Sequence, residues 1–101
     1  MATYISTIKF TARGFKAIRD TTKRAAALKA AASKSGIKVS NIYWTMGTYD
    51  GLLIYEAPDD ETATGLLLKL AGEGNVHTTT VRAFTAAEMD KILANAGGRG
   101  K

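Results

Sequence analysis

The fold is decided by residues 42–57, IYWTMGTYDGLLIYEA. Two runs of aromatic, aliphatic and β-branched residues, 42–46 and 52–57, flank a break that contains Gly47 and Gly51, and this pattern is typical of a β-hairpin. Both runs place large apolar side chains at odd and at even positions. A half-exposed antiparallel strand would instead alternate apolar and polar residues, so we expect both faces of the hairpin to be covered.

The segments on either side of the hairpin alternate between strand-like and helix-like composition. Runs of β-branched and aromatic residues predict strands, whereas runs rich in Ala, Lys, Arg and Leu predict helices. Gly36 suits the left-handed position that ends the first helix, and Pro58 ends the second strand of the hairpin. In chain order we expect strand 3–10, helix 15–35, strand 37–46, strand 52–57, helix 59–70, strand 76–84 and a short final helix that a capping box opens at 85–88.

This order is the ferredoxin-like βαββαβ pattern of an α+β domain with an antiparallel sheet. Right-handed crossovers place the first and third strands at the centre of the sheet and both long helices on one face. Apolar residues at steps of three or four are expected to turn toward the sheet, namely Phe15, Ile18, Thr22, Ala25, Leu28 and Ala32 in the first helix and Ala63, Leu66, Leu67 and Leu70 in the second. The apolar residues on the other face then need a cover, and a second copy related by a twofold axis is the simplest one.

The composition suits one small domain: 101 residues, 46% of them hydrophobic, with no cysteine. Without cysteine the chain has no disulfide, no thiolate metal site and no cysteine nucleophile, and nothing indicates an oxidising compartment. The first residues lack the pattern of a signal peptide, and no run approaches the ~20 apolar residues of a membrane span. We expect a cytoplasmic protein with no membrane partner, a domain over residues 1–96, and a disordered basic, Gly-rich tail at 97–101.

The net charge of +5 is unevenly distributed along the chain. Residues 1–40 hold nine bases and one acid, a balance of +8, whereas residues 41–101 hold five bases and eight acids, a balance of −3. Such a basic half can mark a nucleic-acid partner, but a lysine-rich helix is equally a solvated surface. RNA-recognition domains of this topology begin their third-strand motif with a basic residue, a glycine and an aromatic residue, whereas residues 52–56 are LLIYE. Nucleic-acid binding through the basic first helix, residues 16–34, is therefore an alternative that we disfavour.

A longer pattern extends along nearly the whole chain. Gly47, Tyr49 and Asp50 form a Gly-x-Tyr-Asp motif, which follows YWTM at 43–46 and precedes EAPDDE at 56–61, and the segments 4–11 and 74–85 belong to the same pattern. Together these segments resemble the GYD domain family, which is named for this motif. The resemblance implies a ferredoxin-like domain of the dimeric α/β barrel type in a bacterial family whose members are mostly uncharacterised. It implies no established reaction, and the cofactor, if any, stays unknown.

Candidate ligand-binding residues gather at one end of the hairpin. Trp44, Tyr49 and Asp50 supply an indole, a phenol and a carboxylate, which at the rim of a cavity between paired sheets could orient a small molecule. The competing interpretation is turn chemistry, because an aspartate before Gly51 can bind backbone groups of the turn while Tyr49 simply packs. Our hypothesis is a homo-oligomeric module that binds an unidentified small molecule through Trp44, Tyr49, Asp50 and His77.

His77 is the only histidine in the chain, and histidine is a common general base and haem ligand. Pairing of the last strand with the first puts His77 near Lys9 and Thr79 near Thr7. An even sum of the paired residue numbers would place these four side chains on one face together with Ile5 and Val81, whereas a slip by one residue would substitute Thr78, Thr80 and Arg82.

The second hypothesis is a cofactorless or haem-dependent oxidoreductase of the dimeric α/β barrel type. It rests on analogy of fold, because the sequence carries no recognisable catalytic constellation. The acidic run 59–61 is explained by a helix N-terminus, and no set of metal ligands accompanies it.

Overall fold

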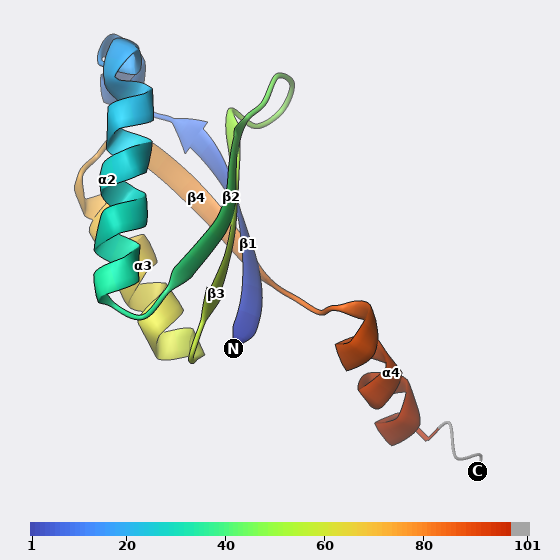
Figure 1. The fold of residues 1–101 in the computed structure, drawn as a ribbon. Helices are drawn as coiled ribbons and strands as arrows, with labels where there is room; N and C mark the ends of the chain where they lie inside the picture. Colours follow the sequence, from blue (N-terminus) through green and yellow to red (C-terminus); the bar gives the residue numbers. More distant parts are fainter. Residues whose placement is uncertain (98–101) are drawn as a thin grey trace.

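The computed structural model describes residues 1–97 and has the α+β architecture that the sequence predicts (Figure 1). Its elements in chain order are β1 (Ala2–Phe10), α1 (Ala12–Lys16), the 3₁₀ turn η1 (Ile18–Asp20), α2 (Thr21–Lys34), β2 (Lys38–Trp44), β3 (Gly51–Ala57), α3 (Asp60–Gly72), β4 (Val76–Ala83) and α4 (Ala86–Asn95). None of the helices in this part of the chain has the length and apolar character that a membrane span requires.

The four strands form one antiparallel sheet in the order β2-β3-β1-β4, which is the ferredoxin-like order. Helices α2 and α3 lie on the same face of this sheet (Figure 1). In the β1–β4 pair, Lys9 lies opposite His77 and Ile5 lies opposite Val81, so the sum of the paired residue numbers is even. The register therefore places Lys9 and His77 on the face that α2 and α3 leave open.

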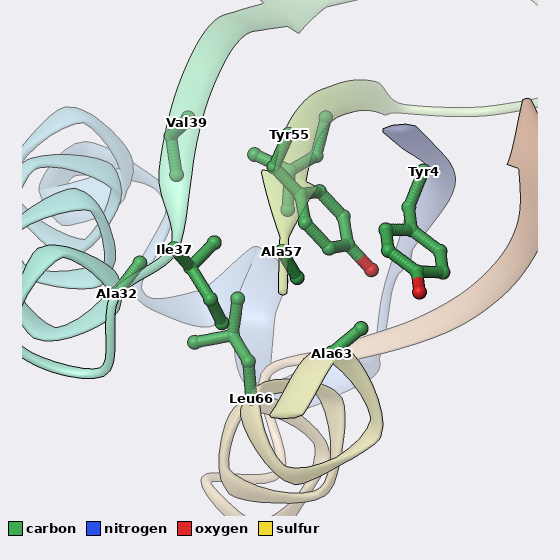
Figure 2. Close-up of a cluster of buried hydrophobic side chains, with 9 residues drawn as sticks. Tyr4, Ala32, Ile37, Val39, Tyr55, Ala57, Ala63 and Leu66 are labelled. Atoms are coloured by element: carbon green, nitrogen blue, oxygen red, sulfur yellow. The ribbon is translucent and has the colours of Figure 1, made fainter. Parts of the chain in front are cut away.

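The core lies between the sheet and the two long helices (Figure 2). Leu53, Tyr55 and Ala57 are fully buried and occupy alternate positions of β3. Small residues let the helices approach them, because Ala32 of α2 and Ala63 of α3 are also buried. A second strand contributes an aromatic partner: the ring of Tyr4 in β1 stacks on that of Tyr55, 5.5 Å between centroids and 20° between planes.

The first helix differs from the sequence prediction of a continuous helix over residues 15–35. It begins earlier, where the Thr11 side chain caps α1, and it is interrupted at Ala17 before η1 and α2. This interruption changes the phase of the helix, so that Phe15 and Ile18 are 54% and 37% exposed instead of facing the core. Thr22 is exposed as well, in the first turn of α2, whereas the expected inward positions Ala25, Leu28 and Ala32 of the same helix are partly or fully buried.

Helix α4 stands away from the rest of the domain (Figure 1). Its predicted capping box is confirmed, because Thr85 and Glu88 each accept a hydrogen bond from the other's backbone N–H. No residue of α4 is buried, and Met89 and Leu93 are 44% and 55% exposed. The apolar stripe of α4 is thus uncovered within residues 1–97. Of the tail that the sequence predicts to be disordered, residues 98–101 lie outside the described residues.

Tyr4 makes the free energy of unfolding depend on pH in the alkaline range. Its hydroxyl donates a hydrogen bond to the Asp60 carboxylate, and this bond, with burial and the negative charge of Asp60, raises the pKa of Tyr4 from 10.0 to about 12. The unfolded chain loses this proton near pH 10, while the native chain keeps it. We therefore expect the free energy of unfolding to fall as pH rises from about 10 toward 12.

Urea unfolding over this pH range measures the effect. Tyr4→Phe should remove this part of the pH dependence, whereas Tyr49→Phe, at an exposed loop position, should retain it. An unchanged slope in Tyr4→Phe would contradict the assignment.

Candidate functional site

A pocket of about 70 Å³ opens between α2 and the helix-covered face of the sheet. The pocket forms because α2 packs tightly only toward its C-terminal end, where Ala32 is fully buried. Nearer its N-terminus, α2 presents Thr21, Arg24 and Ala25 to this space. The opposite wall is largely apolar and includes Ile8, Phe10, Ile42, Trp44 and Leu53.

Trp44 is the predicted site residue that lies at this pocket. It is the last residue of β2 and points to the helix-covered face, where its indole Nε1 donates a hydrogen bond to Thr21 Oγ1 at 3.0 Å. The side chain is 46% exposed, so one part of the indole forms the pocket wall while another part meets solvent. This position suits contact with a ligand that enters between α2 and the sheet.

Asp50 instead joins the hairpin loop to the end of β1. Its carboxylate Oδ2 accepts a hydrogen bond from the Phe10 backbone N–H at 2.9 Å, and its own N–H donates to the Ile8 carbonyl at 2.8 Å. Gly47 supplies the left-handed turn of this loop, with φ of 109°. The turn interpretation is thus partly right: Asp50 binds backbone, but the backbone of another strand. Tyr49 lies in the loop beside it and is 44% exposed.

Removal of the Asp50 carboxylate should weaken the contact between the hairpin loop and the end of β1. Asp50→Ala leaves the Phe10 N–H without its acceptor, and we expect a loss of about 1–3 kcal/mol in the free energy of unfolding. Asp50→Asn keeps an acceptor oxygen and should cost less. Thermal unfolding of both variants measures the difference, and equal losses would contradict a role for the hydrogen bond.

His77 lies on the open face of the sheet, away from the pocket. It is exposed, opposite Lys9, whose Nζ donates a hydrogen bond to the Thr48 carbonyl at 3.1 Å. Trp44 points to the other face, and β2 and β4 are separated by three strand spacings, about 14 Å. One protomer therefore cannot bring His77 and Trp44 together around one small ligand.

The open face also carries the apolar residues that the sequence places there. Ile5, Leu52 and Ile54 are partly buried by their neighbours, and Tyr43 and Val81 are 51% and 55% exposed. Within residues 1–97 no helix covers this face (Figure 1). The prediction that both sides of the hairpin carry large apolar groups is confirmed.

Arg24 is the pocket residue that the sequence reasoning missed. The sequence placed Arg24 among the bases of the first helix and predicted no site role for it. In the structure Arg24 lines the pocket, and its Nη1 donates a hydrogen bond to the Ala17 carbonyl at 2.6 Å. A signal was available, since Thr21, Arg24 and Leu28 follow one another at steps of three and four and share a helix face. The exposed bases of α2 are Lys23, Lys29 and Lys34, and nucleic-acid binding through them stays a prediction.

Among residues 1–97, no three His, Asp or Glu side chains gather closely enough to hold a metal ion. The chain was also compared with known proteins. No curated protein and no solved structure matches it closely enough to count as similar. A family model for the GYD domain matches residues 4–93, which is nearly the whole chain. The chain therefore belongs to the GYD domain family.

Proposed function

We propose that this protein is a homo-oligomeric module that binds a small molecule in the pocket between α2 and the sheet. The observation that carries the proposal is the pocket itself, which combines a largely apolar wall with a few polar groups at one side. Small-molecule sites commonly combine an apolar wall, which supplies binding energy, with a few polar groups, which supply orientation. At about 70 Å³ this pocket would enclose a small ligand or one end of a larger one. Trp44 and Thr21, joined by a hydrogen bond, form the part of the rim where a ligand would enter.

The oligomer would form through the open face of the sheet. Ile5, Leu52, Ile54, Tyr43 and Val81 make an apolar surface there, and a monomer rarely leaves such a surface to solvent. A twofold axis would pair this surface with the same surface of a second copy. In that assembly Lys9, Thr79 and His77 would face the partner sheet, and any cavity between the two sheets would be lined by them rather than by Trp44.

Native mass spectrometry of the purified protein tests both halves of the proposal. We expect an assembly of at least two 10.7 kDa chains that retains a small molecule, and we expect Trp44→Leu to keep the assembly but lose that molecule. Phe84→Leu is the matched control, because Phe84 is an exposed aromatic residue that follows β4 and does not line the pocket. A bare monomer would contradict the proposal.

A further inference from the structure

We infer that the pocket under α2 selects a small organic carboxylate with an apolar body, and that the Arg24 guanidinium binds the carboxylate. The inference rests on the proposed function, because it names the chemical class of the ligand for the same pocket. Its central observation is the state of Arg24: Nη1 is hydrogen-bonded to the Ala17 carbonyl, whereas Nη2 is buried and has no hydrogen-bond partner among residues 1–97.

A buried nitrogen of a guanidinium group without an acceptor is costly. Arginine keeps its positive charge in proteins, and a charged donor that leaves water loses its hydration unless an acceptor replaces it. Most buried polar groups in native proteins are satisfied, so an orphaned one points to a missing partner. Arg24 also lines the pocket of about 70 Å³ between α2 and the sheet. A rotation of its guanidinium would turn Nη2 toward a carboxylate group in this space, while the apolar body of the ligand would extend along the partly exposed Trp44.

Glu73 is the acidic side chain that also lines the pocket. It follows the end of α3 and is exposed, and the ion pairs within residues 1–97 do not include an Arg24–Glu73 pair within 4.0 Å. In this arrangement of the described residues the Glu73 carboxylate does not serve as the acceptor for Arg24 Nη2. Glu73 instead stands at the rim, where its charge would weaken the binding of any anion.

The surroundings of Arg24 decide which anion fits. A phosphate dianion is strongly hydrated and usually needs several donors, whereas Phe10, Ile42 and Trp44 make this wall largely apolar. A planar carboxylate matches the flat guanidinium, and an apolar body of the same molecule would lie against the aromatic wall. The polar atoms beside it belong to Thr21 and Asn75, which can donate or accept a hydrogen bond.

Benzoate and its neutral amide, benzamide, test the inference on the full chain. Trp44 is the only tryptophan, so its indole N–H gives one signal in a ¹H–¹⁵N NMR spectrum and reports directly on the pocket. We expect benzoate to shift this signal in a saturable way, and benzamide to bind at least about tenfold more weakly, because it cannot form the charge-assisted pair. Equal binding of the two probes would overturn the carboxylate class while leaving small-molecule binding intact.

Arg24→Met should lower benzoate affinity by at least about tenfold and erase the preference over benzamide. The variant loses the hydrogen bond from Nη1 to the Ala17 carbonyl, but this carbonyl also accepts the Asp20 N–H at 3.0 Å, so we expect the protein to stay folded. Arg19→Met removes an equal charge from the exposed η1 turn and serves as the matched control. Unchanged benzoate binding in Arg24→Met would overturn the inference.

Glu73→Gln keeps the inference testable if Arg24→Met fails to fold. We expect it to bind benzoate about twofold to threefold more tightly at unchanged thermal stability, because a repelling charge leaves the rim. A loss of stability in Glu73→Gln would mean that Glu73 is the partner of Arg24 in solution, and would overturn the inference. If neither probe shifts the Trp44 signal although native mass spectrometry finds a retained molecule, the inference fails while the proposed function stands.

Discussion

Gly14→Ala is expected to destabilise the protein by about 3 kcal/mol, a fall of ~15 °C in the thermal midpoint for a domain of this size. Gly14 is buried in α1, and a Cβ atom at this position would lie 2.1 Å from the carbonyl oxygen of Asn75. That oxygen accepts the Thr11 N–H at 3.0 Å, and Thr11 Oγ1 donates to the Gly74 carbonyl at 2.7 Å. The methyl group would therefore separate α1 from the turn that precedes β4.

Gly65→Ala is the matched control for this experiment. Gly65 lies in α3, and a Cβ atom there would meet nothing within 4 Å. Because alanine favours the helix over glycine, this variant should gain about 0.5–1 kcal/mol. Differential scanning calorimetry of both variants measures the contrast. A Gly14→Ala protein as stable as the parent would contradict the close approach of α1 to Asn75.

Ile54→Lys should weaken self-association by about 100-fold or more. The side chain lies near the centre of the open face, on β3 between β2 and β1, opposite Asn41 and Ile5. In the proposed dimer, lysine would bury a charge there and bring it near the same charge of the partner copy. Light scattering across a dilution series measures the change.

Leu68→Lys controls for the general effect of replacing an exposed apolar residue. Leu68 is 69% exposed on α3, in the helix layer rather than on the open face. We expect it to associate like the parent, while circular dichroism shows both lysine variants folded. An Ile54→Lys protein that remains dimeric would mean that the open face is not the interface.

The local pattern of the chain was enough for most of the fold. The apolar runs of the hairpin located β2 and β3, whereas the structure showed that Leu53 and Tyr55 face the helices and Leu52 and Ile54 the open face. Strand order followed from the handedness of the two crossovers, which is a property of L-residues rather than of particular contacts. The N-terminal cap of α4 was equally local, because Thr85 and Glu88, three residues apart, form its capping box with each other's backbone.

The candidate site depended on contacts that no local pattern encodes. Asp50 looks like a turn residue, yet its carboxylate binds the Phe10 N–H, forty positions away in the chain. Trp44 and His77 both looked like parts of one site, but strand register turns them to opposite faces of the sheet.

Sequence by itself determined the order of the elements, the sheet and its two apolar faces, because these follow from periodicity and chirality along a short stretch of chain. Only the tertiary structure decided the break at Ala17, the detached position of α4 and the pocket that contains Arg24. The physical reason is that these features depend on how elements pack in three dimensions. Whether a base such as Arg24 meets water or an apolar wall is set by the neighbours that the fold brings to it.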